Sequence, residues 1–199
     1  MSRSEYLPLE CWRGMYSVMQ RANVNALRVC LDTGMRIDDV LSLTFDNFSK
    51  VKGGYAIDFV AKKTGKQGRA IISCELVGEL KSCAGSKSCA GSSEWVFPGR
   101  NAAKHRTRQA VYKDLKKATA LLGVQGQISP HSARKTFAVE LRKKAGVAEV
   151  QKALQHTDAE TTNLYAFADV AARHGANSVQ IAEIAEIIAE KVVEKLKKG

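Results

Sequence analysis

Residues 53–73 change the hydrophobic period of the chain, and this change limits the folds that are open to it. In GGYAIDFVAKK the side chains of Tyr55, Ile57 and Phe59 recur at every second position, which is typical of a β-strand. The sequence TGKQG that follows predicts a turn, and RAIIS predicts a returning strand. The sequence therefore predicts one short β-hairpin.

On both sides of this hairpin, apolar residues recur at helical spacing. Helices are expected over residues 9–19, 23–32, 36–43 and 77–80, over the second half of the basic segment 99–118 (ending near residue 123), and over 130–145, 147–154, 159–167 and 179–196. Ser129 is a good N-cap and Pro130 suits a first turn. The Ser/Gly-rich repeat at residues 82–93 predicts a loop. We therefore expect a mainly α fold with a small antiparallel β-sheet, an α+β chain.

The composition is that of a globular protein. Its 199 residues are 45% hydrophobic, which suits one domain, or one domain with an appendage. The start, MSRSEYLPLE, is polar and does not resemble a secretion signal. The uncharged apolar stretches are too short to cross a bilayer. We therefore expect a cytoplasmic protein without a membrane partner.

The five cysteines are an odd number, which favours free thiols in such a protein. Cys11 and Cys30 lie in apolar helical patterns and are typical of small buried residues. Cys83 and Cys89 lie in the near-duplicate KSCAGSKSCAGS, whose spacing matches no common zinc pattern. We expect no metal site and no cofactor.

The net charge is the first indication of function. Lys and Arg number 31 against 20 Asp and Glu, so the formal net charge is +11. Residues 176–199 contain four Glu and four Lys, which places the excess on residues 1–175. A basic body favours a polyanionic partner, although a basic protein without such a partner has the same composition.

Arg36 and Lys63, both in the first part of the chain, are candidates for binding an anion. Arg36 follows Thr33 and Gly34 at a predicted helix start, and Asp39 is placed to hold or orient it. Lys63 lies beside the hairpin turn. For Arg36 and Asp39 the alternative is an ordinary surface ion pair, which contributes little to stability. For Lys63 the alternative is a solvated basic turn.

His131 and Arg134 lie three residues apart on one predicted helix, so both side chains leave the same face. The first turns of a helix favour an anion through their free amides and the helix dipole. A guanidinium matches phosphate oxygens with a planar fork of donors. The pair is a candidate phosphate clamp, and the alternative is a capping His and a surface Arg.

The stretch LQHTDAETTNLYAF places Tyr165 nine residues after His156. Thr157 can cap a helix, on which Tyr165 then lies about two turns along. The phenol is either a half-buried aromatic whose hydroxyl bonds the backbone, or a reactive group.

These motifs occur in one order: TGMRIDDVLSL, the hairpin KKTGK, HSARKTFAVEL and LQHTDAETTNLY. In this order they resemble the catalytic domain of the tyrosine recombinases, the phage-integrase family, over roughly residues 9–168. The family pattern is an Arg after a T-G turn, a hairpin Lys, H-x-x-R, a His or Trp after a Leu-Gly-like pair, and a Tyr nine residues later. Gln155 stands where Gly is usual, and Asp39 where Glu is common.

The resemblance implies a role for each of these positions. Arg36 and Arg134 would bind the scissile phosphate, and Lys63 would donate a proton to the leaving 5′-oxygen. Asp39 would occupy the supporting acidic position that follows the first arginine.

The remaining positions would carry out the chemistry. Tyr165 would be the nucleophile, His131 the general acid/base, and His156 a hydrogen-bond donor to the phosphate. A phenol has a pKa of about 10, so it must lose its proton as it attacks. The product would be a covalent 3′-phosphotyrosine, formed without metal or ATP. The alternatives are strand relaxation of the type IB topoisomerase kind, and a non-catalytic DNA-binding protein on the same fold.

The resemblance also implies partners and a domain plan. We expect residues 1–174 to form the catalytic domain, residues 175–199 to form an amphipathic helix that packs in cis or on another protomer, and an N-terminal core-binding domain to be absent. Double-stranded DNA would be the partner, bound by a homotetramer, in a prokaryote, phage or mobile element. The expected DNA-backbone contacts are Arg100, Lys104, Arg106, Arg108, Lys113, Lys116 and Lys117.

Overall fold

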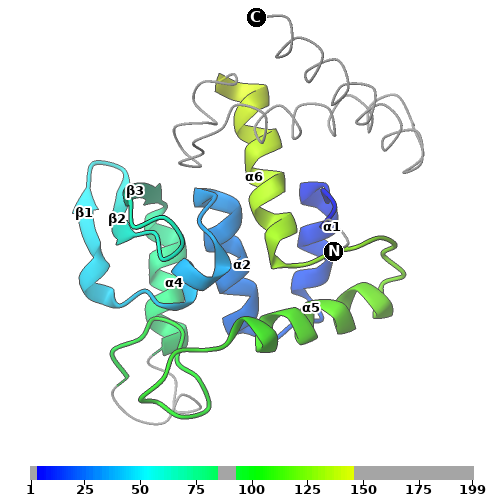
Figure 1. Ribbon diagram of the computed structural model, residues 1–199, viewed down its shortest axis with the longest axis horizontal. Coiled ribbons are helices and arrows are strands. Elements are labelled where there is room, and N and C mark those ends of the chain that lie inside the picture. The colour runs from blue at the N-terminus through cyan, green and yellow to red at the C-terminus, as the bar shows by residue number, and fades with distance from the viewer. Residues whose placement is uncertain (1–3, 85–92, 146–199) are drawn as a thin grey trace, which may run out of the picture. The chain divides into compact units, whose positions relative to one another are not determined.

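The computed structural model describes residues 4–84 and 93–145 (Figure 1). Internal contacts divide the chain into two units, residues 1–137 with 153–155, and residues 138–152 with 156–199. Of the second unit, residues 138–145 are described. The expected helices after residue 146, with His156, Tyr165 and the amphipathic tail, lie outside the described residues.

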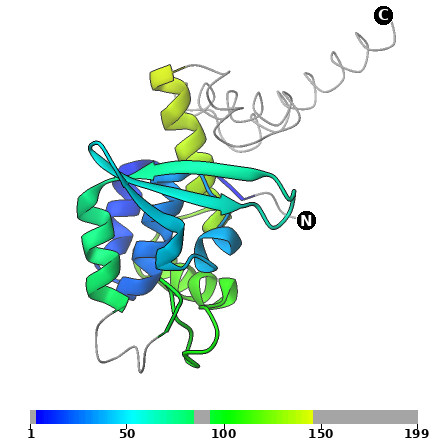
Figure 2. The same ribbon diagram turned by 90° about the vertical axis from the view of Figure 1, so that its left-hand side faces the viewer.

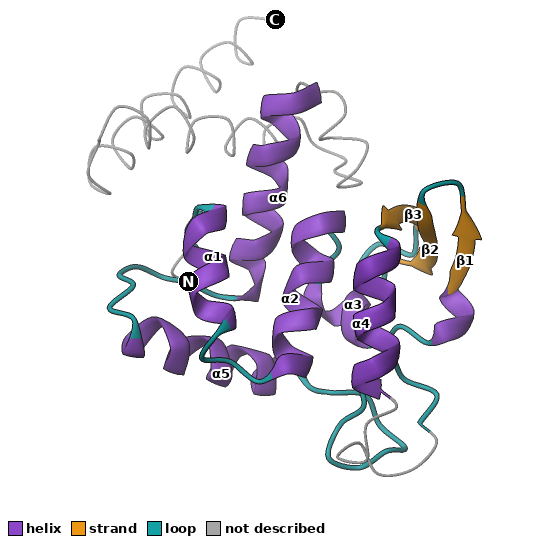
Figure 3. Cartoon of the chain, turned by 180° about the vertical axis from the view of Figure 1, so that it is seen from behind, coloured by secondary structure: helices purple, strands orange, loops and turns teal. Residues whose placement is uncertain are grey.

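Helices predominate in the described part of the chain (Figure 3). The elements are α1 (Leu9–Tyr16), α2 (Arg21–Thr33), α3 (Ile37–Leu41), the 3₁₀ helix η1 (Phe45–Asn47), β1 (Phe48–Val51), β2 (Gly54–Val60), β3 (Gln67–Ile72), α4 (Cys74–Ala84), α5 (Arg108–Leu121) and α6 (Pro130–Ala145). This confirms the expected mainly α fold with a small antiparallel sheet. Within the described residues, no helix has the length and apolar content needed to cross a bilayer.

The sheet is antiparallel in the order β1-β2-β3. Strands β2 and β3 form the predicted hairpin, with Tyr55 opposite Ile72 and Ile57 opposite Ala70. Strand β1 was not predicted, because FSKV is too short to show a period by itself. It pairs with β2 through Phe48 and Ile57, so cross-strand contacts rather than local pattern define it.

Helix α2 lies at the centre of the first unit and contacts α3, α4, α5 and β3. Figure 2 shows the three strands beside α4 and α2. The buried core takes Trp12 and Met15 from α1, Leu27 from α2, and Leu76 and Leu80 from α4. The central helix therefore has buried neighbours on several sides.

Helix α4 is longer than the four residues predicted at 77–80. It begins at Cys74, where the Ser73 hydroxyl accepts a hydrogen bond from the Leu76 amide at 3.2 Å, and it continues to Ala84. The start of the Ser/Gly-rich repeat is therefore helical rather than a loop, because burial of one apolar face extends the helix beyond its local preference.

The predicted stop of α2 at Thr33 and Gly34 is confirmed. Gly34 has φ 69° and is the C-cap, and its amide donates to the Cys30 carbonyl at 2.9 Å. The Thr33 hydroxyl donates to the Val29 carbonyl at 2.6 Å. A left-handed residue at this position is the usual place for glycine, because a β-carbon is strained there.

Gly34→Ala is expected to lower the free energy of unfolding by about 1–2 kcal/mol, because alanine resists the left-handed conformation. Gly14→Ala is the matched control. Gly14 lies in α1, and a β-carbon there meets nothing within 4 Å, so alanine should raise stability by up to about 1 kcal/mol. Chemical denaturation measures both. The same sign for the two variants would contradict this account of how α2 ends.

Candidate active site

Four of the six expected catalytic residues line one cavity of about 900 Å³. Arg36 comes from the start of α3, Lys63 from the β2–β3 turn, and His131 and Arg134 from the first turns of α6. The cavity is also lined by Ser4, Ile37, Asp38, Asp39, Lys62, Arg108, Gln109, Tyr112, Ser129 and Pro130. The fold thus brings together segments that lie far apart in the sequence.

Arg134 is 4% exposed, and one of its guanidinium nitrogens, Nη1, donates to the Gly34 carbonyl at 2.5 Å. A buried guanidinium needs compensating partners, because removal from water is costly for a charge. The Gly34 carbonyl lies at the C-terminus of α2, where the helix dipole stabilises a cation. The end of one helix therefore holds the arginine of another.

Arg36 is half-buried and is the N-cap of α3, with φ −71° and ψ 145°. Its carbonyl accepts hydrogen bonds from the Asp39 and Val40 amides, both at 3.0 Å. Only Met35 separates Arg36 from Gly34 in the chain. The turn that holds Arg134 therefore also sets the position of Arg36.

Asp39 is 4% exposed, and its Oδ1 accepts a hydrogen bond from the Lys62 amide at 3.0 Å. The buried carboxylate thereby ties α3 to the hairpin, because the backbone N–H of Lys62 needs an acceptor. That Asp39 also holds or orients Arg36 stays a prediction.

The hairpin turn itself is closed by backbone bonds. The Ala61 amide donates to the Lys66 carbonyl at 2.9 Å, and the Gly65 amide donates to the Ala61 carbonyl at 2.8 Å. Gly65 has φ 66°. The exposed side chains of Lys62 and Lys63 both line the cavity, and Lys66 is not among the lining residues.

Helix α6 begins as the sequence predicts. The Ser129 hydroxyl accepts from the His131 amide at 3.2 Å, and the Ser132 hydroxyl accepts from the Ser129 amide at 3.1 Å. This reciprocal arrangement satisfies amides that a helix start leaves without partners. His131 is exposed and Arg134 is buried, yet both line the same cavity, which confirms that they share a helix face.

The N-terminal end of α5 completes the cavity. Thr107 caps this helix, its side chain accepting from the Ala110 amide at 3.2 Å. Arg108 Nη1 lies 3.4 Å from Asp38 Oδ2. Gln109 and Tyr112, the latter 41% exposed, also line the cavity. Sequence reasoning missed Tyr112, although its spacing of four residues from Arg108 would place both on one helix face.

The seven expected DNA-backbone residues do not all face solvent. Arg100, Lys104, Arg108, Lys113 and Lys117 are exposed, and Lys116 and Arg106 are half-buried. Arg106 Nη1 donates to Asn23 Oδ1 at 3.2 Å and to Gln20 Oε1 at 3.4 Å. Its guanidinium is therefore engaged within the fold.

Asp114 is the one acidic residue in the basic segment at residues 99–118. Its Oδ2 accepts from the Asn23 side-chain amide at 2.6 Å and from the Gln20 backbone amide at 2.9 Å. This carboxylate thus anchors α5 to the start of α2. Its neighbours Lys113 and Lys117 are exposed.

The cavity is strongly cationic. Its lining includes five Lys or Arg side chains (Arg36, Lys62, Lys63, Arg108 and Arg134) against two Asp. Among the described residues, no group of three or more His, Cys, Asp or Glu side chains is arranged to hold a metal ion. What the lining offers an anion is therefore guanidinium, ammonium and imidazole groups around one concave surface.

Known proteins resemble this chain in sequence and in fold. The family model described as the phage integrase family matches residues 14–171. The chain belongs to the phage integrase family. A curated relative, tyrosine recombinase XerD of Rhizobium meliloti (strain 1021), is 29% identical over 160 residues, which cover 78% of this chain and 50% of the relative.

A second relative, tyrosine recombinase XerD of Vibrio vulnificus (strain YJ016), is 30% identical over 150 residues, covering 70% of this chain and 46% of the relative. The chain thus spans about half the length of the curated relatives it matches.

Solved structures share the fold. The XerH site-specific recombinase bound to difH substrate, in a pre-cleavage complex, has a TM-score of 0.70 at 20% identity, covering 83% of this chain and 51% of that chain. The catalytic domain of bacteriophage HP1 integrase has a TM-score of 0.58 at 20% identity, covering 83% of this chain and 89% of that chain. The described fold is therefore that of an integrase catalytic domain.

Asp39→Ala is expected to lower the free energy of unfolding by about 1–3 kcal/mol, because the Lys62 amide loses its acceptor. Hydrogen exchange at this amide should accelerate more than the change in global stability explains. Asp39→Asn keeps an oxygen acceptor and is the matched control. If Asp39→Ala left exchange at Lys62 at the wild-type rate, the carboxylate would not be what fixes the hairpin to α3.

Proposed function

We propose that this chain is the catalytic part of a site-specific DNA recombinase that cleaves and rejoins strands through a covalent 3′-phosphotyrosine. The observation that carries the proposal is the single cavity lined by Arg36, Lys63, His131 and Arg134. The DNA-bound relatives in the same fold, XerH and a lambda integrase dimer on a COC′ core site, support DNA as the partner.

In the proposed cleavage step, the phenolic oxygen of Tyr165 attacks the scissile phosphorus. The Tyr165 O–P bond forms as the bond from phosphorus to the 5′-oxygen breaks. His131 accepts the phenol proton, and Lys63 supplies a proton to the departing 5′-oxygen. The charge on the phosphate oxygens is met by Arg36 and Arg134, and His156 adds a hydrogen bond. Such preorganised donors contribute about 10²–10³ in rate each.

Rejoining reverses these steps. The 5′-hydroxyl of a partner strand attacks the phosphotyrosine and gives its proton to Lys63. The new bond from phosphorus to the 5′-oxygen forms as the Tyr165 O–P bond breaks, and the Tyr165 phenol recovers its proton from His131. The covalent link conserves the energy of the broken bond, so the proposed cycle needs no ATP. The two arginines and two histidines are proposed to stabilise the phosphate charge without a metal ion. A different partner strand in the second step makes the outcome recombination rather than repair of a nick.

Other nucleophiles fit this chemistry less well. Burial raises the pKa of the Cys30 thiol and that of the Tyr16 phenol, which disfavours the ionised form of both. Neither is a lining residue of the cavity. Among the described tyrosines, Tyr112 is the one that lines it, and it provides the informative comparison for Tyr165.

The nucleophile is tested by trapping a covalent adduct on a nicked suicide substrate. Wild type and Tyr112→Phe should form a protein–DNA adduct, and Tyr165→Phe should form none, because only a phenol oxygen at 165 is proposed to bond phosphorus. Gel mobility under denaturing conditions measures this. Loss of the adduct in Tyr112→Phe with retention in Tyr165→Phe would move the nucleophile to α5. No adduct with wild type would favour a non-catalytic DNA binder.

We further propose that four protomers act on DNA, that residues 175–199 form a helix which packs in cis or on a neighbouring protomer, and that the protein works in the cytoplasm. The lambda integrase dimer on its COC′ core site supports assembly of more than one protomer. Sedimentation with and without a DNA duplex tests the tetramer.

The exposed lysines of α5 are proposed to bind the DNA backbone. Neutralising Lys113 and Lys117 to Gln should weaken binding to all sequences, and the slope of log affinity against log salt should flatten by about 0.9 for each phosphate that the variant no longer neutralises. Fluorescence anisotropy over a salt series measures this. The control for net charge is the pair Lys50→Gln and Lys52→Gln, which removes the same two charges at exposed positions in and directly after β1. An equal change of slope in the control would show a general charge effect instead of binding by α5.

A further inference from the structure

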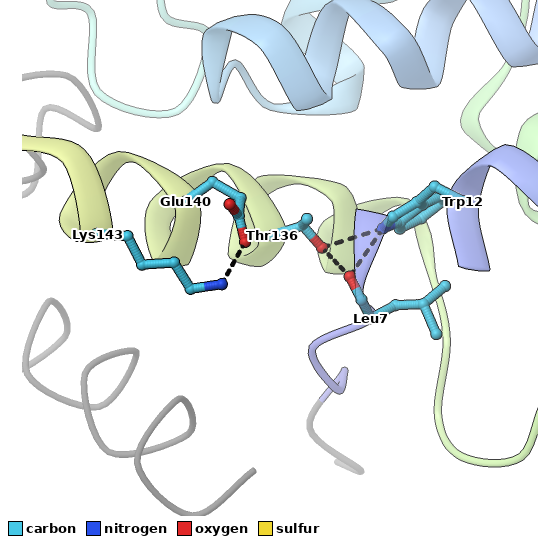
Figure 4. Close-up of polar contacts among 5 residues, drawn as sticks. All are labelled: Leu7, Trp12, Thr136, Glu140 and Lys143. Carbon is cyan, nitrogen blue, oxygen red and sulfur yellow. Dashed lines mark hydrogen bonds and ion pairs between the residues drawn. The ribbon is translucent and has the colours of Figure 1, made fainter. Parts of the chain in front are cut away.

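Residues Ser4–Leu7, here called the N-terminal strap, form hydrogen bonds with α6 and with the loop that precedes it. The Leu7 carbonyl accepts hydrogen bonds from the Thr136 hydroxyl at 2.6 Å and from Trp12 Nε1 at 3.2 Å (Figure 4). Trp12 Nε1 also lies 3.0 Å from the Thr136 hydroxyl oxygen. This buried triangle fixes one end of the strap to α6.

The middle of the strap is paired with the loop before α6. The Glu5 amide donates to the Gln127 carbonyl at 3.0 Å, and Glu5 Oε1 accepts from the Gln127 amide at 3.0 Å. The neighbouring Gly126 has φ 100°, and a β-carbon there would clash with the Glu5 carboxylate. The loop conformation thus accommodates the Glu5 side chain closely.

The first residue of the strap reaches the cavity. Ser4 is a lining residue, and its hydroxyl lies 2.7 Å from the Ser129 hydroxyl. Ser129 in turn accepts from the His131 amide. The Ser4 carbonyl accepts from the Lys135 ammonium. A chain of hydrogen bonds therefore leads from the strap to the backbone of His131.

This connection matters because His131 lies in the first turn of α6 and lines the cavity. The position of its side chain in the cavity follows from the position of the backbone that carries it. The first turn of a helix lacks intrahelical partners for its amides and frays most readily. Capping by Ser129 stabilises that turn, and Ser4 restrains the Ser129 hydroxyl from the other side.

We propose that the N-terminal strap is a positioning element of the active site, which holds the first turn of α6 so that His131 meets the reacting groups. Ser4 and Glu5 are its positioning residues. They act through Ser129 and Gln127, and they form no bond with the scissile phosphate. The inference rests on the proposed strand-cleavage function.

The test is single-turnover adduct formation on a suicide duplex, with the dissociation constant for the same duplex measured separately. Ser4→Ala and Glu5→Ala should each slow adduct formation by about three- to tenfold, the rate equivalent of one lost hydrogen bond. The dissociation constant should stay close to that of wild type. Ser4→Thr restores a hydroxyl and Glu5→Gln restores an oxygen acceptor, so both should recover most of the rate.

Glu10→Ala is the matched control for Glu5→Ala, because Glu10 is an exposed residue of α1 and its loss changes the net charge equally. Thermal unfolding of every variant sets an assay temperature at which all are folded. Equal rates for Glu5→Ala and Glu10→Ala would overturn the inference. The inference would also be overturned if the slower adduct formation of Ser4→Ala and Glu5→Ala were matched by an equally large rise in the dissociation constant for the duplex. If wild type itself formed no adduct, the proposed function would fail instead.

Discussion

The candidate active site depends on the hydrogen bond from buried Arg134 to the Gly34 carbonyl. The two residues are a hundred positions apart, and the bond joins the end of α2 to the first turns of α6. Glycine is needed there for the left-handed turn, and the turn then presents a carbonyl at the negative end of the α2 dipole. One short segment therefore ends a helix, holds one arginine and positions Arg36 two residues later.

The acidic residues of the cavity have a related role. Asp39 bonds the Lys62 amide, and Asp38 lies beside Arg108. A carboxylate in a phosphate-binding cleft opposes the anion through its charge. The buried Asp39 is compatible with such a site because its oxygen is used in linking α3 to the hairpin. The exposed Asp38–Arg108 pair is weak by itself, and a phosphate can compete for Arg108.

In α5 and the residues just before it, some charged side chains bond within the fold and others face solvent. Asp114 of α5 accepts hydrogen bonds from Gln20 and Asn23, and Arg106, which precedes α5, donates to the same two residues. Asp114 lies between Lys113 and Lys117 in the sequence, but its carboxylate bonds to α2 and to the residue before it, and the two lysines are exposed. The net charge of the segment thus understates the positive charge that its outer face presents to solvent, because the carboxylate is used inside the fold.

The sequence by itself determined the helix-rich fold, the β2–β3 hairpin, the stop at Gly34 and the cap at Ser129, because each follows from a local period or a local turn preference. It also provided the ordered motifs of the family. Only the tertiary structure decided that Asp39 bonds the Lys62 amide, that Arg106 is engaged inside the fold, that β1 joins the sheet and that Ser4 reaches the cavity. The physical reason is that these are contacts between distant segments, and a hydrogen bond between residues far apart in the chain leaves no local pattern from which it can be read.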